Sequence, residues 1–204
     1  RKLEIGFIIK PYNDGSKDNT LQVLQELEEK YPELQVMNKP NSGHGPTILQ
    51  GYKEADSEWV FQIDSDNEMK AEYFYKLWNN RKNHDFLIGT RENREQTLPR
   101  KVVSAISRTT VKLFYGTGIT DVNSPYRLMK KEKFENIYNS IPIDTFAPNV
   151  IIAGMAAKKN MRIFEINVPI QFRTTGEVSI KKWKLLKAAT KSWWQTVRFS
   201  TGNK

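Results

Sequence analysis

Short apolar runs alternate with amphipathic segments along this chain, and that alternation constrains its fold more than any other feature. Residues 4–9, 59–63 and 86–89 are apolar runs with the length of buried strands, and the first of them stops before Pro11. Residues 21–31 repeat leucines at helical spacing. Strands that alternate with helices predict an α/β fold, in which a mostly parallel central sheet carries helices on both of its faces.

The length and composition favour a single main domain of this class. The chain has 204 residues, of which 38% are hydrophobic and 27% are charged, a balance typical of globular proteins. It has no cysteine, which excludes disulfides and thiolate metal ligands and favours a cytoplasmic location. No apolar run approaches the roughly 20 residues that span a bilayer. Any membrane contact is therefore expected to be peripheral, unless a spanning part lies outside this chain.

A net charge of +9 predicts an anionic partner. Nucleic acid, anionic lipid and phosphorylated small molecules would all fit that charge. A nucleic-acid-binding module would interleave basic and aromatic side chains over a sheet face. Here many basic residues and several tryptophans are concentrated after residue 180, and the apolar run at residues 59–63 ends in acidic residues. The sequence therefore predicts no nucleic-acid partner.

Two carboxylates follow that apolar run directly, at Asp64 and Asp66. Open α/β sheets bind ligands at the carboxyl ends of their strands, so both side chains are expected at the binding edge of the sheet. Two carboxylates one residue apart can reach one hard cation, and Mg²⁺ typically takes one or two carboxylates together with substrate phosphates. The pattern indicates a site for Mg²⁺ or Mn²⁺ that holds a diphosphate. An acidic turn after a strand is the alternative interpretation.

Residues 100–115 are predicted to form a second amphipathic helix. Its inward face is expected to consist of Val102, Val103, Ile106, Leu113 and Phe114. Arg100, Ser104 and Arg108 recur at intervals of four residues on the other side.

Four motifs occur in the order in which the family 2 glycosyltransferases of GT-A fold have them. The matching segments are Ile8-Ile9-Lys10-Pro11-Tyr12-Asn13, which resembles the family's first strand and its Pro-x-Tyr-Asn ending, the Asp-Gly-Ser segment Asp14 to Thr20, the loop Asn41 to Gly45, and the strand end Gln62 to Asp66. The resemblance implies a Rossmann-like GT-A catalytic domain over residues 1–180 that uses a UDP- or GDP-linked nucleotide-sugar donor. It implies a donor pocket lined by Pro11, Tyr12, Asp14, Gly43, His44 and Asp64, with the metal on Asp64 and Asp66.

The second half of the chain resembles the polyprenyl-phosphate branch of that family, typified by dolichyl-phosphate mannose synthase. The similar segments are Gly89-Thr90-Arg91, Arg100 to Ser104, and Asp121 to Leu128. The resemblance implies an inverting transfer to undecaprenyl or dolichyl phosphate. It implies catalytic roles for Asp64, Asp66 and Arg91, and an acceptor-phosphate site formed by Arg91, Arg100, Ser104 and Arg127. Guanidinium groups bind phosphate bidentately, and a phosphate oxygen is already ionised, so the reaction needs no strong general base.

Two alternatives stay open at this point. The acceptor could be a saccharide hydroxyl, as in cell-surface polysaccharide synthesis, in which case a carboxylate base is needed and Asp121 or Asp144 could serve. Arg100 and Ser104 could instead be solvated residues on a helix face.

His44 stands where the family often has lysine, so the resemblance predicts no permanent positive charge at that position.

One departure from the family pattern concerns Asn13 and Asp14. The family places a helix and a second strand between its Pro-x-Tyr-Asn ending and its Asp-Gly-Ser segment, whereas these two residues adjoin here. Either residues are missing from this numbering, or the chain is shorter at this point. A nucleotide pocket without that strand would lose a wall, so we expect the first explanation.

Residues 181–204 are predicted to form a basic amphipathic helix. On a helical wheel its apolar face consists of Trp183, Leu186, Thr190, Trp193, Trp194 and Val197, and another face carries Lys184, Lys187, Lys191 and Arg198. Tryptophan favours the headgroup boundary and lysine favours anionic lipid, so this helix could hold the protein on the cytoplasmic, inner face of a membrane. Packing of the same face on the protein's own core is an equal alternative.

Overall fold

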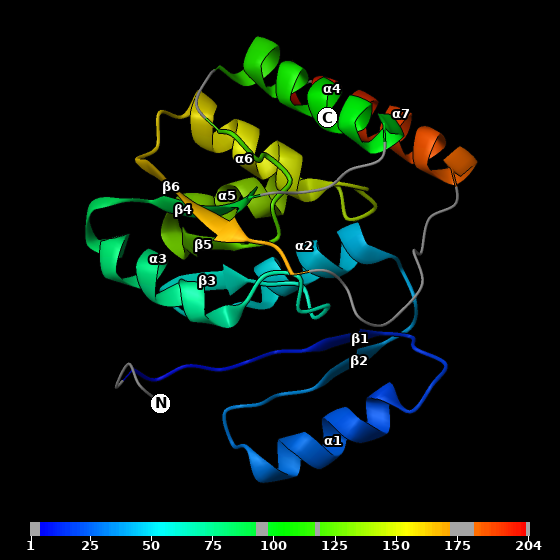
Figure 1. Cartoon of the computed structure of the whole chain (residues 1–204), viewed down its shortest axis with the longest axis vertical. Helices are drawn as coiled ribbons and strands as arrows, with labels where there is room; N and C mark the ends of the chain where they lie inside the picture. Colours follow the sequence, from blue (N-terminus) through cyan, green and yellow to red (C-terminus); the bar gives the residue numbers. More distant parts are fainter. Residues whose placement is uncertain (1–4, 93–97, 117–118, 172–181, 203–204) are drawn as a thin grey trace.

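The computed structural model describes residues 5–92, 98–116, 119–171 and 182–202, and for residues 98–100 and 182–189 it describes the backbone alone. The described part of the chain forms two β-sheets, one of two strands and one of four (Figure 1). Helices pack on both faces of the four-stranded sheet. The predicted α/β fold is therefore confirmed.

The four-stranded sheet, called the main sheet below, has the strand order β3–β5–β4–β6. Its strands are β3 (Trp59–Gln62), β5 (Arg127–Lys130), β4 (Phe86–Glu92) and β6 (Ile163–Pro169). Strand β5 is antiparallel to both of its neighbours and β4 is parallel to β6, so β3, β4 and β6 run in one direction. The sequence pattern does not predict β5, because its four residues lie between a polar loop and a helix that follows at once.

Side chains of the main sheet alternate between two hydrophobic clusters, as the strand repeat of two residues requires. Phe86, Ile88 and Met129 enter the larger cluster, with residues of α2, α4, α5 and α6. Leu87 and Leu128 enter a second cluster together with Leu77 of α3. These helices are α2 (His44–Glu54), α3 (Phe74–Asn80), α4 (Leu98–Tyr115), α5 (Lys131–Ser140) and α6 (Pro148–Lys158), and short 3-10 turns at residues 71–73 and 81–83 flank α3.

The two-stranded sheet belongs to what we call the N-terminal unit, residues 5–39. Its strands β1 (Tyr12–Asp14) and β2 (Met37–Lys39) are parallel and are joined by α1 (Thr20–Lys30). The prediction of a buried strand over residues 4–9 is wrong, because the pairing described here begins at Ile9 and continues through Pro11 into β1. Proline is tolerated there because its carbonyl oxygen accepts a bond from the next strand and its missing N–H is not needed.

Asn13 and Asp14 are consecutive residues of β1, and the full chain has no residues between them. The expectation that residues are missing from the numbering at this point is therefore wrong. Strand β1 leads directly into the Asp-Gly-Ser segment, so this chain has no helix and no strand between the two motifs. No strand of the described chain pairs with both β1 and β3, which belong to separate sheets.

Helix α2 links the N-terminal unit to the main sheet. On one side, a carbon atom of the Tyr12 ring lies 3.2 Å from where a Cβ on Gly51 would stand. On the other side, Leu49 and Tyr52 enter the larger core cluster, and the Tyr52 hydroxyl donates a hydrogen bond to Gln62 of β3. Helix α2 thus contacts both β1 and β3, although these strands belong to separate sheets.

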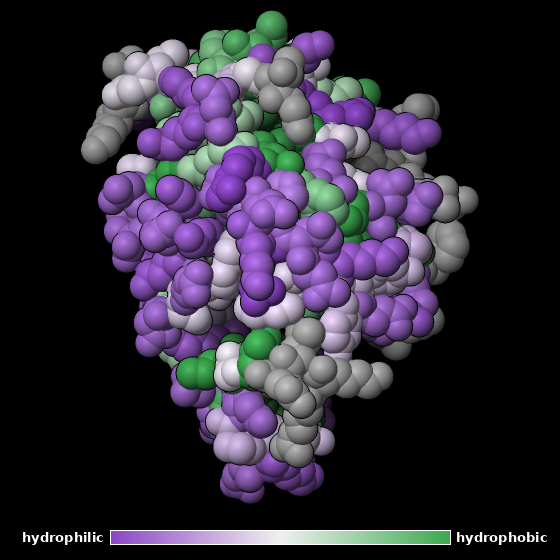
Figure 2. Space-filling model, turned by 90° about the vertical axis from the view of Figure 1, so that its left-hand side faces the viewer, coloured by the Kyte–Doolittle hydropathy of each residue, from purple (hydrophilic) through white to green (hydrophobic). Residues whose placement is uncertain are grey.

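Helix α4 lies beside α7 (Lys182–Ser200), and both helices contact α6 (Figure 1). The inward face predicted for α4 is wrong at four positions, which are largely exposed: Val102 (56%), Ile106 (47%), Leu113 (73%) and Phe114 (40%). Val111 and Tyr115 supply the buried side, because α4 carries more than one apolar stripe and its packing on α6 and α7 selects among them. Hydrophobic surface also shows at the top of Figure 2, above a mostly hydrophilic face.

The tryptophans of α7 are exposed where the structure describes them. Trp193 and Trp194 are 43% and 60% exposed, whereas Thr196 is buried and its carbonyl oxygen accepts a bond from the Tyr115 hydroxyl of α4. The side chains of Trp183 and Leu186 lie outside the described residues. No helix within the described ranges combines the length and the hydropathy that a bilayer span requires.

Candidate functional site

The topology of the main sheet brings several polar segments to one edge. Strands β3 and β4 end at this edge, and β5 begins there, because Arg127 pairs with Gln62 on one side and with Ile88 on the other. Asp64, Arg91 and the loop before β5 consequently share the carboxyl edge of the sheet. Open α/β sheets bind their ligands at this edge.

Asp64 lies between the end of β3 and the start of α2. Its Oδ1 accepts a hydrogen bond from Gln62 Nε2 at 3.2 Å and lies 3.9 Å from Nε2 of His44. Burial raises the pKa of Asp64, and the charge of Asp66 raises it further, whereas His44, the Gln62 bond and the charge of Arg91 act in the opposite direction. The net pKa is raised, so the ionised carboxylate would be stabilised by a nearby cation.

Asp66 is the second carboxylate of the candidate metal site. Its Oδ1 accepts the N–H of Glu68 at 3.1 Å, and Asn67 between them has a φ of 57°, so a tight turn follows β3. The described residues contain no group of three or more His, Cys, Asp or Glu side chains that could hold an ion by themselves. Two carboxylates nevertheless fit an Mg²⁺ or Mn²⁺ ion that takes its other ligands from a diphosphate and from water.

A buried polar cluster orients Gln62, which donates a hydrogen bond to Asp64. The Tyr52 hydroxyl and Nδ2 of Asn149 both donate to Oε1 of Gln62, the latter at 3.0 Å, and Tyr52 and Asn149 are each 3% exposed. Because Oε1 of Gln62 is fixed as an acceptor, its amide nitrogen is directed to Asp64. The sequence interpretation missed Asn149; the signal that could have found it is a polar side chain within the otherwise apolar α6.

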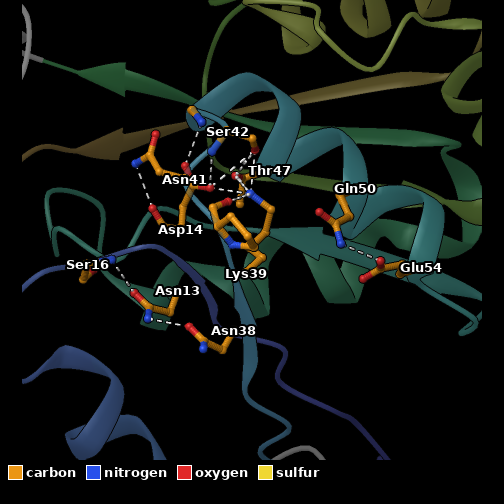
Figure 3. Close-up of polar contacts among 12 residues, drawn as sticks. Asn13, Asp14, Ser16, Asn38, Lys39, Asn41, Ser42, Thr47, Gln50 and Glu54 are labelled. Carbon is orange, nitrogen blue, oxygen red and sulfur yellow. Dashed lines mark hydrogen bonds and ion pairs between the residues drawn. The ribbon is translucent and has the colours of Figure 1, made fainter.

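Asp14 lies at the carboxyl end of β1 and fixes the loop that leads into α2 (Figure 3). Its two carboxylate oxygens accept the backbone N–H groups of Ser42 and Gly43, each at 2.8 Å. Lys39 forms an ion pair with the same carboxylate and donates to the Ser42 hydroxyl. Partial burial, the largest influence, raises the pKa of Asp14, but these bonds together hold it at about 2. The nucleotide-binding role of Asp14 stays a prediction.

Glycine is needed at two positions where this loop enters α2. Gly43 has a φ of 95°, in the region that side chains rarely adopt. A Cβ on Gly45 would lie 2.3 Å from the carbonyl oxygen of Phe146, which is too close for any other residue. His44 between them is 69% exposed in its side chain, and it is the residue of α2 whose ring nitrogen lies 3.9 Å from Asp64.

Tyr12 contacts the other end of α2. The Tyr12 hydroxyl donates to Glu54 at 2.6 Å, and burial together with this bond raises its pKa. An 11-residue helix is roughly 16 Å long, and Asp14 and His44 lie at its opposite end. The Tyr12 hydroxyl thus contacts the end of α2 opposite to Asp14 and His44, and the donor-pocket roles of Pro11 and Tyr12 stay predictions.

Arg91 of β4 forms a bidentate ion pair with Asp121. Its Nε and Nη2 donate to Oδ2 and Oδ1 at 2.6 and 2.8 Å, and the two side chains are 10% and 20% exposed. This engagement makes Asp121 a poor base for a saccharide hydroxyl. Asp144, the other candidate base, is 70% exposed and lies 3.4 Å from Lys191.

The other predicted acceptor residues have different environments. Arg127 is 0% exposed, and its guanidinium donates to the backbone carbonyls of Val122, Ser124 and Asn149. It orders the loop before β5, and its contact with a phosphate stays a prediction. Ser104 is half-buried on α4, and the side chain of Arg100 lies outside the described residues.

The comparison with protein families identifies the family of this chain. Residues 9–138 match the model described as glycosyl transferase family 2. The chain belongs to glycosyl transferase family 2. Among its curated relatives, a dolichyl-phosphate beta-glucosyltransferase from Trichomonas vaginalis is 28% identical over 188 residues. These residues cover 87% of this chain and 58% of that protein.

A bacterial relative is similar over the same extent. An undecaprenyl-phosphate 4-deoxy-4-formamido-L-arabinose transferase from Proteus mirabilis is 25% identical over 190 residues, which cover 91% of this chain and 56% of that protein. This family 2 chain thus spans 58% and 56% of the length of these two curated relatives.

A solved structure confirms the fold. Glucosyl-3-phosphoglycerate synthase from Mycobacterium tuberculosis, in complex with Mn²⁺ and UDP-glucose, superposes with a TM-score of 0.62 at 13% identity and covers 95% of this chain and 67% of that chain. At this identity the likeness shows the fold alone, and the predicted GT-A fold is the fold that the chain has.

Proposed function

We propose that this family 2 chain transfers a sugar from a UDP- or GDP-linked donor to a polyprenyl phosphate, with inversion at the anomeric carbon. One observation carries the proposal: a single edge of the main sheet holds Asp64 and Asp66 after β3 and Arg91 on β4. The acidic side suits a cation bound to the donor's diphosphate, and the basic side suits a second phosphate. The two relatives described above are named as transferases to dolichyl and undecaprenyl phosphate, which supports this class of acceptor.

In the proposed reaction, an ionised oxygen of the acceptor phosphate attacks the anomeric carbon as the bond from that carbon to the donor's diphosphate breaks. The nucleoside diphosphate leaves with the bonding electron pair, and the new phosphate ester forms on the opposite face of the sugar. The attacking oxygen already carries its charge, so no proton has to be removed. Mg²⁺ or Mn²⁺, when bound, offsets the charge that develops on the leaving diphosphate.

The residues of this chain divide between donor and acceptor. On the donor side, Asp64 and Asp66 hold the cation, and the loop fixed by Asp14 presents Gly43 and His44 at the start of α2, where backbone N–H groups attract phosphate. On the acceptor side, Arg91 orients the phosphate, and Arg100 and Ser104 of α4 are proposed to complete its binding site.

We place the protein peripherally on the inner, cytoplasmic face of a membrane, next to its lipid acceptor. The support is the exposed apolar surface of α4 and α7. Its most exposed side chains are Leu113, at 73% exposure, and Trp194, at 60%. The same two helices also carry exposed basic residues, namely Lys101, Arg108, Lys112, Lys191 and Arg198. Exposed apolar and basic side chains on two neighbouring helices favour binding to anionic lipids.

A thermal-shift series tests the donor side. UDP and GDP are each added with and without Mn²⁺. One of the two nucleotides is expected to stabilise the chain, and this stabilisation should require Mn²⁺. At about 100 times its Kd a ligand adds roughly 2.7 kcal/mol of stability, and Asp66→Asn should abolish this gain. Asp56→Asn, an exposed carboxylate before the amino end of β3, is the matched control and should keep it. A metal-dependent gain that survives Asp66→Asn unchanged would remove Asp66 from the site.

An acceptor assay tests the reaction itself. The donor carries a labelled sugar, and the chain receives polyprenyl phosphate in anionic vesicles in one arm and a saccharide acceptor in the other. Label is expected in the lipid fraction alone. Label that appears only in the saccharide product would exclude the proposed acceptor.

A further inference from the structure

The loop at residues 119–126 lies at the edge of the main sheet that holds the candidate site. The Ser124 hydroxyl donates to the carbonyl oxygen of Gly89 on β4 at 2.5 Å. The buried guanidinium of Arg127 donates to the carbonyl oxygens of Ser124 and Val122, at 2.6 and 3.3 Å from Nη2. The loop is therefore tied to both β4 and β5.

A third tie fixes the start of the same loop. Thr120 donates through its backbone N–H and its hydroxyl to the two carboxylate oxygens of Glu165 on β6, each at 2.7 Å. Asp121 follows directly, so its backbone lies between this tie and those at Ser124. The loop gives Asp121 a fixed position, which a side chain on an untethered loop would lack.

Asp121 receives three donors of Arg91. The guanidinium donates from Nε and Nη2, and the backbone N–H points at Oδ2 at 3.5 Å. The Asp121 carboxylate thus contacts both the backbone and the guanidinium of Arg91, which selects one orientation of the arginine side chain. Arginine otherwise has many rotamers to choose from, so the carboxylate settles where the guanidinium points before any ligand arrives.

The pair leaves part of the guanidinium available. Arginine has five N–H donors, and the bonds to Asp121 use Nε and Nη2. Within the described part of the chain, Nη1 makes no hydrogen bond to protein, and the one buried side-chain nitrogen or oxygen without a partner is Oγ1 of Thr145. The Nη1 edge of Arg91 therefore reaches solvent, at the edge of the sheet where Asp64 lies and close enough for its charge to act on that carboxylate.

We propose that Asp121 is a positioning residue, which holds Arg91 so that its Nη1 edge meets the acceptor phosphate. The inference rests on the proposed function, because the acceptor phosphate comes from it. A carboxylate next to Arg91 weakens the attraction of that arginine for phosphate. The pair is useful to the reaction only through orientation, so removal of Asp121 should weaken acceptor binding even though it removes a negative charge.

The test measures acceptor and donor separately. Asp121→Asn should raise the KM for polyprenyl phosphate about tenfold, while the Kd for the nucleoside diphosphate with Mn²⁺ changes less than about twofold. Asp85→Asn is the matched control, because Asp85 forms the same kind of bidentate pair with Arg162, at 2.9 and 3.2 Å, at the opposite end of β4. The control should lose comparable stability and keep the acceptor KM.

A double-mutant cycle shows whether Asp121 acts through Arg91. Arg91→Lys keeps the positive charge but cannot take the forked pair, so in that background Asp121→Asn should change the acceptor KM less than about twofold. An equal rise in both backgrounds, or an unchanged KM in Asp121→Asn alone, would overturn the inference while the proposed function stands. Nucleotide binding without any transfer to polyprenyl phosphate by the unaltered chain would overturn both.

Discussion

The N-terminal unit and the main sheet differ in how much apolar surface they bury. Phe86, Leu87 and Ile88 of the main sheet are all 0% exposed, whereas α1 of the N-terminal unit has no buried residue, and Ile8 and Ile9 are 53% and 52% exposed. Full burial of one such side chain contributes roughly 1.5–3 kcal/mol. The main sheet therefore supplies most of the stability of the described chain.

The candidate site draws on both regions. Asp64 and Arg91 come from the well-packed main sheet, and Asp14 comes from the N-terminal unit, where polar bonds to the loop before α2 replace a hydrophobic core. Strands β1 and β3 lie in different sheets, and α2 contacts both. The comparison teaches that the residues proposed for the metal and the acceptor rest on the well-buried main sheet, whereas the loop proposed for the donor depends on a few polar contacts.

The largest expected effect is a difference in unfolding free energy between a variant of the main sheet and a variant of the N-terminal unit. Leu128→Ala removes a side chain that is 1% exposed in the main sheet, and it should cost about 2–5 kcal/mol. Leu27→Ala on α1 removes one that is 37% exposed, and it should cost less than about 1 kcal/mol. Urea unfolding of both variants measures the difference. Similar losses in the two variants would show that the N-terminal unit is as well packed as the main sheet.

An intermediate effect tests the start of α2, where the two regions meet. Gly45→Ala would place a Cβ 2.3 and 2.4 Å from the carbonyl oxygens of Phe146 and Thr145. We expect a loss of about 1–3 kcal/mol from overpacking and weaker binding of nucleoside diphosphate, because the helix start must shift. Gly6→Ala in the N-terminal unit meets nothing within 4 Å and is the control. Calorimetric titration that finds nucleotide binding unchanged in Gly45→Ala would separate this helix start from the donor site.

The sequence predicted the parts of this molecule that depend on local pattern. The α/β class, the position of Asp64 and Asp66 after an apolar strand, and the loop before α2 all follow from short segments. A polar residue within the apolar α6 could have drawn attention to Asn149, but its contact with Gln62 joins residues 87 positions apart, so no local pattern predicts that partner. The exposed stripe of α4 was beyond prediction for a related reason: the helix has several apolar positions, and the choice among them is made by α6 and α7.

The smallest expected effect concerns the pH dependence of the polar contacts in the N-terminal unit. The pKa of Asp14 is about 2 in the folded chain, below its ordinary value of 3.8. A folded-state pKa below the unfolded one contributes stability that is fully present above about pH 4 and is lost as the pH falls toward 2. The carboxylate is 21% exposed and partly screened, so we expect less than about 1 kcal/mol.

Asp14→Asn should remove this contribution, so the difference in unfolding free energy between wild type and variant should shrink from pH 5 to pH 2.5. Denaturant titrations at the two pH values measure it, and Asp56→Asn, an exposed carboxylate outside the N-terminal unit, is the matched control. Because Asp14 binds the loop that leads into α2, the same variant should also weaken nucleotide binding at pH 7. A constant difference across the two pH values would mean that the carboxylate of Asp14 does not hold that loop, and the donor side would then need another anchor.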